Sequence, residues 1–268
     1  MTGSGAAPDD RHLHVAGLWR YPVKSLRAEP LETAALTPDG VAGDRLVHVR
    51  GDRGPLTGRT RHRLLTIPAA TGPDGVPLVA GHRWDSAEAA AVVRDRAGPP
   101  ARLAAHDGPE RFDILNLLVA TDGAVAALGA DIRRLRPNLL IGGVPGDAER
   151  TWPGRALAIG DALIGIHSVR RRCVVTTIDP DTGAQEVGVL RDINDRFGGR
   201  IALDAWVIRP GTVALGDRVA LVETTAVPGV LGGWTVGAPY AALSARGVAR
   251  VGGPAGPASA NEGGAIAR

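Results

Sequence analysis

The sequence contains a single cysteine, Cys173, in 268 residues. One thiol cannot form an intramolecular disulfide, and an iron–sulfur cluster needs about four thiolates or a mixed set of cysteines and histidines. The chain is therefore expected to hold neither a disulfide framework nor an electron-relay cluster. Electrons for any redox chemistry would have to come from a separate protein.

Aromatic residues are also scarce, since Phe, Trp and Tyr together make up 3% of the chain. Proteins that bind single-stranded nucleic acid stack the bases on aromatic side chains, and the arginines here are dispersed along the sequence. A net charge of +3 therefore does not indicate a nucleic-acid partner. The core must instead be packed from Val, Leu, Ile and Ala.

Long apolar runs are absent from the sequence. No uninterrupted run approaches the roughly 18 residues that a helix needs to cross a bilayer, so no membrane contact is expected. Residues 1–10 lack the basic region and apolar stretch of a secretory signal peptide. These features predict a cytoplasmic protein.

Short apolar runs punctuated by 37 Gly and 20 Pro favour a mainly β fold of barrel or sandwich type with a few helices. Turns are expected at 37–40 and 179–183, and helices at 124–128, capped by Thr121 or Asp122 and ended by Gly129, and at 189–197, ended by Gly198. The predicted strands cover residues 13–21, 45–49, 64–67, 139–141, 156–159, 163–169, 174–178, 205–208 and 218–222.

Cys173 directly follows three arginines, Arg170, Arg171 and Arg172. Nearby positive charge lowers the pKa of a thiol, and the resulting thiolate is the form that attacks electrophiles and ligates soft metals. The alternative is a small apolar residue buried with Val174 and Val175, since a buried thiol packs like a hydrophobe. The local sequence alone favours the buried apolar residue.

Four motifs change that interpretation when they are taken together, in the order in which they occur. They are Tyr21-Pro-Val-Lys-Ser25, Gly43-Asp-Arg45, Arg134-Leu-Arg-Pro-Asn138 and Arg172-Cys-Val-Val-Thr-Thr-Ile-Asp-Pro-Asp-Thr-Gly183. Over residues 12–223 the chain resembles the MOSC family, which includes the amidoxime reducing component and the C-terminal domain of molybdenum cofactor sulfurase. The resemblance implies a smaller N-terminal MOSC-type β domain at 11–105, a MOSC-type β-barrel domain at 106–224 and a C-terminal extension at 225–268 with a low-complexity tail.

The resemblance also implies a cofactor, the molybdenum cofactor (Mo-molybdopterin), with Cys173 as the catalytic thiolate that ligates the metal. A buried pterin phosphate needs cations and hydrogen-bond donors around it. The family positions that hold the cofactor correspond to Lys24, Ser25, Arg45, Arg59, Asp113, Arg136, Asn138 and Arg172. Viewed one at a time, these residues also allow ordinary roles, such as a pairing of Arg45 with Asp44 or a surface position for Arg136.

Two departures from the family pattern concern the expected pocket. Gly123 stands where family members often have serine, and Ile201-Ala202 stands where they often have Phe-Gly. The first removes a polar group, and the second is expected to alter a wall near the pocket. The departures put the substrate in question more than the cofactor.

Three functions follow from the resemblance. The first is an oxidoreductase that reduces N-hydroxylated or N-oxide small molecules at the metal, with a flavoprotein reductase or a ferredoxin as electron donor. The second is a carrier of sulfur or of the cofactor, in which Cys173 bears a persulfide or a metal ligand. The third is a protein that keeps the fold without binding metal.

Overall fold

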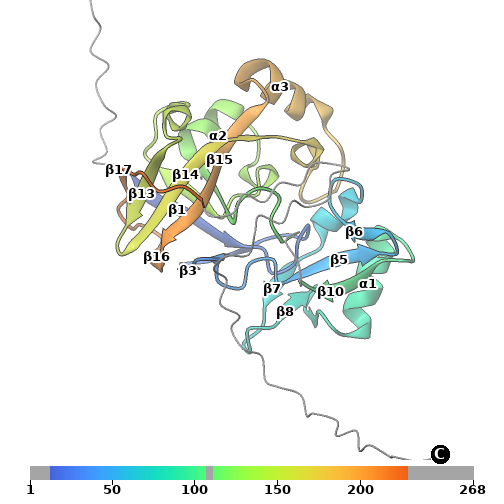
Figure 1. The fold of residues 1–268 in the computed structure, drawn as a ribbon. Helices are drawn as coiled ribbons and strands as arrows, with labels where there is room; N and C mark the ends of the chain where they lie inside the picture. The colour runs from blue at the N-terminus through green and yellow to red at the C-terminus, as the bar shows by residue number, and fades with distance from the viewer. Residues whose placement is uncertain (1–12, 107–110, 229–268) are drawn as a thin grey trace, which may run out of the picture.

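The computed structural model describes residues 13–106 and 111–228. These residues form mostly strands, with three α-helices among them (Figure 1). The largest sheet has eight strands and curls into part of a barrel, and three smaller sheets accompany it. The predicted fold class, mainly β with a few helices and a smaller N-terminal β domain, is confirmed.

The eight-stranded sheet has the order β17-β13-β14-β15-β11-β12-β1-β2. All its pairs are antiparallel except β11 with β12. In chain order the strands are β1 (His14–Arg20), β2 (Glu29–Pro30), β11 (Leu117–Thr121), β12 (Leu139–Gly142), β13 (Arg155–Ile159), β14 (Ala162–Arg171), β15 (Arg200–Arg209) and β17 (Ala220–Glu223).

The small sheets are three-stranded, and two of them pack with α1 (Ala87–Ala97) in a lobe that lies at the lower right of Figure 1. Their strands are β3 (Thr33–Thr37), β4 (Gly40–Val41), β5 (Val47–Gly51), β6 (Gly54–Leu56), β7 (Ala69–Thr71), β8 (Pro77–Val79), β9 (His82–Arg83), β10 (Arg102–Ala105) and β16 (Gly211–Ala214).

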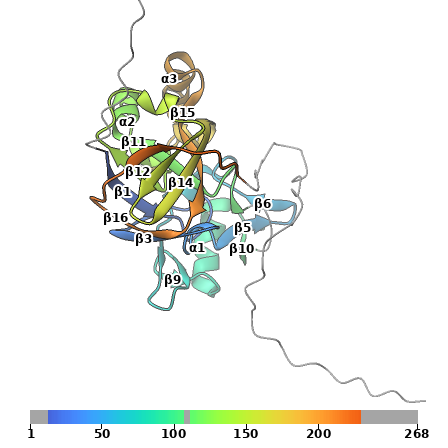
Figure 2. The same cartoon turned by 60° about the vertical axis from the view of Figure 1, so that its left-hand side comes forward.

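The N-terminal and C-terminal parts of the chain share strands. β1 pairs with β12 in the large sheet, and β16 pairs with β3. Figure 2 shows β16 and β3 side by side beneath the curled sheet. The two parts are therefore joined by backbone hydrogen bonds, and the boundary expected near residue 105 stays a prediction.

The helix ends follow from local chemistry. α2 (Asp122–Leu128) is capped by Thr121, whose hydroxyl accepts a hydrogen bond from the Ala124 backbone, and it ends at Gly129 with φ 69°. α3 (Val187–Phe197) ends at Gly198 with φ 62°. Both predicted helices are confirmed, whereas α1 lies in a segment for which no helix was expected.

Two predicted strands are wrong. Residues 62–66 and 174–177 form the 3₁₀ helices η2 (His62–Thr66) and η6 (Val174–Thr177). In η6 the hydroxyls of Thr176 and Thr177 donate to carbonyls three residues earlier, at 2.8 and 2.7 Å. Threonine bonds of this kind compete with strand pairing and stabilise a tight turn. In residues 174–177 these side-chain hydrogen bonds outweigh the strand propensity of the β-branched residues.

Smaller differences concern β5 and β16. The strand expected from Arg45 begins at Val47, because Arg45 lies in a turn with φ 53°, and no strand was expected at β16. The described residues contain no helix that is long and apolar enough to cross a membrane. The low-complexity tail lies outside the described residues.

Candidate functional site

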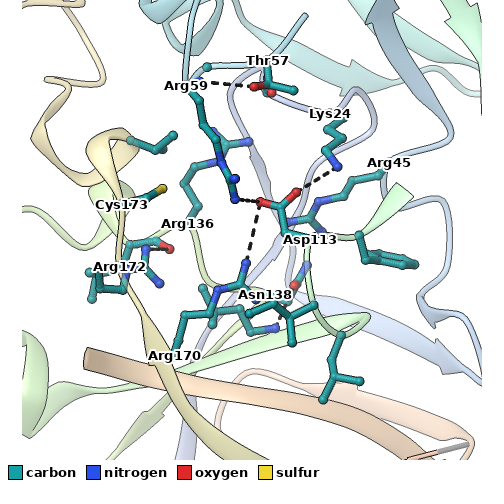
Figure 3. Close-up of a pocket in the computed structure, with 18 of the residues that line it drawn as sticks. Lys24, Arg45, Thr57, Arg59, Asp113, Arg136, Asn138, Arg170, Arg172 and Cys173 are labelled. Atoms are coloured by element: carbon teal, nitrogen blue, oxygen red, sulfur yellow. Dashed lines mark hydrogen bonds and ion pairs between the residues drawn. The ribbon is translucent and has the colours of Figure 1, made fainter. Parts of the chain in front are cut away.

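All nine predicted site residues line one cavity of about 310 Å³. Figure 3 shows the labelled side chains converging on this space from segments far apart in the sequence. Lys24 and Ser25 follow β1, Arg45 precedes β5 and Asp113 precedes β11. The remaining predicted residues on the wall are Arg59, Arg136, Asn138, Arg172 and Cys173.

The cavity is strongly cationic. Among the described residues, Asp113 is the only acidic residue on its wall. Such an excess of desolvated positive charge is costly without an anionic partner. The basic residues on the wall are Lys24, Arg45, Arg59, Arg136, Arg170, Arg171 and Arg172.

Three residues on the cavity wall have a left-handed backbone. The φ angles are 71° at Ser25, 53° at Arg45 and 58° at Arg136. A non-glycine residue in this region costs about 1–2 kcal/mol, and such residues concentrate at binding and catalytic sites. Because all three residues lie on one cavity, we infer that the fold tolerates this backbone strain to orient their side chains.

Tyr21 holds two of the arginines. The Arg136 and Arg45 guanidinium groups lie over its ring, 4.3 and 4.9 Å from the centroid. The Tyr21 hydroxyl donates to the Pro137 carbonyl at 3.0 Å, and the Tyr21 backbone N–H donates to Asp44 at 2.7 Å. Burial raises the pKa of Tyr21 to about 12, so the phenol stays protonated and can keep donating this bond.

Asp113 is the counter-ion inside the cavity. Its carboxylate lies 2.9 Å from Lys24 Nζ, 3.1 Å from Arg59 Nη2 and 3.8 Å from Arg170 Nη2 (Figure 3). Burial alone would raise the pKa of Asp113, but Lys24, Arg59 and Arg170 together hold it well below its usual range. The group therefore remains ionised at neutral pH.

Asp113 is expected to contribute stability that disappears in acid. A carboxyl whose pKa is lower in the folded than in the unfolded chain stabilises the fold above the unfolded pKa, near 4, and stops doing so as the pH falls through the folded pKa. Asp113→Asn should therefore cost about 1–2 kcal/mol at pH 7, after allowance for solvent screening of the 31% exposed side chain. Urea unfolding from pH 7 down to pH 3 measures the difference.

The cost of Asp113→Asn should shrink as the pH is lowered below about 4. Asp52→Asn is the matched control, because the Asp52 side chain is 82% exposed and lies 3.6 Å from its partner. A cost that stays constant across this range would refute the role of Asp113 as a charged counter-ion.

Arg172 and Arg136 are half-buried cations, and the bonds found among the described residues use only part of their hydrogen-bonding capacity. Arg172 Nη2 donates to the Leu135 carbonyl at 2.7 Å, and Arg136 Nη2 donates to the Leu26 carbonyl at 2.7 Å. Arg172 Nε is buried and has no hydrogen-bond partner among the described residues. Burial, reinforced by Arg170, lowers the pKa of Arg172 to about 10, and burial also lowers the pKa of Arg136.

Cys173 lies between β14 and η6, at the end of the strand that carries Arg170 and Arg171. It is half-buried and contributes to the cavity wall rather than to the hydrophobic core. Its sulfur points into the cavity in Figure 3. The thiol therefore has access to whatever the cations bind.

Asn138 has a different surrounding from the other predicted residues. Its side-chain oxygen accepts a hydrogen bond from the Leu118 backbone at 3.2 Å, and its amide nitrogen donates to the Trp19 carbonyl at 3.3 Å. It thus joins β11 to the end of β1 and is buried at 1% exposure. These bonds give Asn138 a structural task on the wall of the cavity.

Several contributors were not predicted as site residues. Arg170 lines the cavity and forms an ion pair with Asp204, a fully buried residue of β15. Tyr21 begins a recognised motif, but its role depends on cation–π contacts that only the folded chain reveals. The cavity wall is therefore supported by contacts between residues far apart in the sequence, which no local sequence pattern indicates.

The departures from the family pattern lie off the cavity. Gly123, Ile201 and Ala202 do not line the cavity, but Ala202 packs against Leu118, which does. The expectation of an altered wall near the pocket therefore stays a prediction. A Cβ atom on Gly123 would stand 2.1 Å from the Val144 carbonyl oxygen, which explains the glycine. Ala202 has φ 65°, a conformation that a glycine adopts without strain.

No group of three or more His, Cys, Asp or Glu side chains that could hold a metal ion occurs in residues 13–106 and 111–228. Protein side chains there could supply one thiolate to a metal but not a full set of ligands. Any metal at Cys173 would need further ligands from a bound organic group.

The chain is similar to proteins of known sequence and of known structure. Human mitochondrial amidoxime-reducing component 1 is 25% identical over 284 residues, which cover 78% of this chain and 82% of that protein. Among solved structures, the YUAD protein from Bacillus subtilis has a TM-score of 0.44 at 12% identity and covers 80% of this chain and 97% of its own. YiiM from Escherichia coli has a TM-score of 0.38 at 16% identity, with 78% and 72% covered.

Two family models match consecutive parts of the sequence. The model for the MOSC N-terminal beta barrel domain matches residues 12–97, and the model for the MOSC domain matches residues 117–220. The cavity lies where these two regions meet, since Lys24, Arg45 and Arg59 come from the first and Arg136 and Cys173 from the second. The chain therefore belongs to the family of proteins in which a MOSC N-terminal beta barrel domain precedes a MOSC domain.

Proposed function

We propose that the cationic cavity binds a molybdenum cofactor, with Cys173 as the protein ligand of the metal. The observation that carries the proposal is the placement of one half-buried thiol on a wall whose described residues include seven basic side chains and a single carboxylate. A phosphate monoester carries close to two negative charges at neutral pH, and it would offset the desolvation of these cations.

The residues present fit such a group. Arg172 Nε has no hydrogen-bond partner among the described residues, and burial lowers the pKa of Arg136. Both observations fit cations that an anionic ligand would stabilise. A thiolate is a soft ligand that suits a metal already held by sulfur. Lys24, Ser25, Arg45, Arg59, Arg136 and Arg172 would hold the phosphate and pterin.

The proposed reaction is the reduction of N-hydroxylated or N-oxide small molecules. Reduction of an N-hydroxylated substrate breaks the N–O bond, consumes two electrons and two protons, and releases water. When bound, the molybdenum group would supply the two-electron redox chemistry. The relative named for amidoxime reduction supports this substrate class.

The chain's own residues bind and orient in this scheme. Asp113 stays ionised because its pKa is held low, so it acts as a counter-ion to Lys24 and Arg59 and not as a proton donor. Electrons come from a separate flavoprotein reductase or ferredoxin, because one cysteine provides no cluster. A turnover assay with NADH or NADPH as the only other component should give no product.

A second candidate function is that of a sulfur or cofactor carrier. The partial exposure of Cys173 favours it, because a sulfane sulfur on this thiol could be reached from outside the cavity. The two candidates predict different contents of purified protein, namely molybdenum with pterin for the oxidoreductase and sulfane sulfur without metal for the sulfur carrier.

Elemental analysis and pterin fluorescence on protein from a host that makes the cofactor test the proposal. Wild-type chain should contain about one molybdenum and one pterin per protein. Cys173→Ala should lose most of the metal and keep the pterin, because the cations hold the phosphate independently of the thiol.

Cys173→Ser serves as the matched variant that preserves the size of the side chain and weakens soft-metal ligation. It should resemble Cys173→Ala in metal content. Unchanged molybdenum in both variants would contradict ligation by Cys173, and sulfane sulfur in metal-free wild-type protein would support the sulfur carrier. Absence of metal, pterin and sulfane sulfur would leave only a protein that has kept the fold.

A further inference from the structure

A second cavity, of about 300 Å³, lies directly behind the first. Leu65, Arg136 and Val175 line both cavities, so the wall between them is built from these side chains. The second cavity is bordered by the end of β1, the 3₁₀ helix η4 (Ile132–Arg134) and the turn at 179–183. None of the predicted site residues except Arg136 reaches it.

The lining of this second cavity combines two kinds of side chain. One part is apolar and includes Trp19 and Tyr21 together with Pro30, Pro137 and Pro180. The other part consists of four arginines, Arg27, Arg133, Arg134 and Arg136. Among the described residues no acidic side chain contributes to the lining.

The acids that pair with these arginines lie outside the cavity. Arg133 pairs with Asp131 and Asp181, both at 2.7 Å, and Arg134 pairs with Glu186 at 2.8 Å. The carboxylates are 36%, 55% and 54% exposed, in the same order. Arg134 also pairs with Asp179 at 3.3 Å, whose side chain is 26% exposed, and Arg27 pairs with Asp181 at 3.1 Å. These carboxylates partly offset the charge of the arginines, but none of them lines the cavity.

Two arginines form the most defined part of the wall. Arg134 is buried at 6% exposure, and its Nη1 has no hydrogen-bond partner among the described residues. Arg27 Nε and Nη2 donate to the Pro180 carbonyl at 3.0 and 2.6 Å, which ties the segment after β1 to the turn at 179–183. The cavity therefore has a fixed frame rather than a wall of mobile surface side chains.

We propose that this second cavity is a binding site for a planar aromatic anion, such as an aromatic carboxylate. Apolar walls exclude a small hydrated anion as the preferred ligand, and the absence of acids from the lining excludes a cation. Guanidinium groups both stack on aromatic rings and bind carboxylates in bidentate fashion. A cavity near 300 Å³ has the size of a small-molecule site.

The proposal does not depend on the molybdenum cofactor. A ligand here would touch the side of Arg136 and Val175 that faces away from the first cavity. Its presence can therefore be measured on the full-length chain whatever the first cavity contains.

Calorimetric titration with naphthoate tests the site. We expect one naphthoate to bind per chain, and the neutral isostere naphthamide to bind about tenfold more weakly because it lacks the charge that the arginines recognise. Ile132→Asp places an acid on the cavity wall and should weaken naphthoate binding at least about tenfold. Ile132→Asn, of the same size as the aspartate, should stay within about threefold of wild type.

Lys24→Met locates the binding, because Lys24 lines the first cavity and not the second. Naphthoate binding should persist in this variant and should not be displaced by inorganic phosphate. Loss of binding in Lys24→Met, displacement by phosphate, equal affinity in Ile132→Asp and Ile132→Asn, or no binding at millimolar naphthoate would each overturn the proposal. Unchanged molybdenum in Cys173→Ala would contradict the function proposed for the first cavity and would leave the naphthoate result unaffected.

Discussion

Asp204→Ala is expected to lower the free energy of unfolding by about 3–5 kcal/mol, the cost of breaking a buried ion pair from one side. Asp204 lies on β15 at 1% exposure and pairs with Arg170 of β14, which is 16% exposed. The two strands run antiparallel, with Ser168 directly opposite Asp204. Among the described residues, removing the carboxylate would leave Arg170 with one acidic neighbour, Asp113, at 3.8 Å.

Chemical denaturation of Asp204→Ala, Asp204→Asn and Ser168→Ala measures this effect. Asp204→Asn keeps the size and a hydrogen-bond acceptor, so it isolates the charge and should cost less than alanine. Ser168→Ala removes only a 3.5 Å hydrogen bond and should cost less than about 1 kcal/mol. An Asp204→Ala protein as stable as Ser168→Ala would show that the pair does not hold the strands together.

The same substitution should disturb the cavity. Arg170 links the buried Asp204 to Asp113, so one arginine joins the sheet to the counter-ion of the site. In Asp204→Ala this guanidinium is free to move toward Asp113. The structural pair and the binding wall are thus parts of one charged network.

Most strands of the large sheet could be predicted because they are apolar runs bounded by Gly and Pro, but no strand was predicted at β2 or β11. The predicted ranges 139–141, 156–159 and 163–169 all fall within observed strands. Prediction failed at η2 and η6, where strand-like residues form tight turns. In η2, Thr66 donates to the Arg63 carbonyl at 2.8 Å, so side-chain bonding to nearby carbonyls outweighed the β propensity.

The site could be predicted only through its motifs. Lys24, Arg45 and Arg136 are separated by long stretches of chain, and nothing in their spacing shows that they meet. The left-handed backbone at Ser25, Arg45 and Arg136 could not be predicted either, because none of these residues is a glycine. Arg170 was missed because its partner, Asp204, is 34 residues away and is reached only through sheet pairing.

The most discriminating prediction concerns Arg172, whose charge costs stability when the cavity holds no anion. Burial lowers its pKa to about 10 from 12.5, which corresponds to a cost on the order of 1–3 kcal/mol for the charged form. Arg172→Met would remove that cost and forfeit the bond to Leu135, worth about 1 kcal/mol. Cofactor-free Arg172→Met should therefore be as stable as wild type or more stable by up to about 2 kcal/mol.

Cofactor retention should change in the opposite direction. If the cavity binds an anionic cofactor, loss of a charged hydrogen-bond donor beside Cys173 should reduce pterin and molybdenum per chain at least about tenfold. Arg191→Met is the control, because Arg191 is exposed on α3 and does not line the cavity, and it should change stability and cofactor content little. A destabilised Arg172→Met that keeps its cofactor would instead assign Arg172 to the support of the fold.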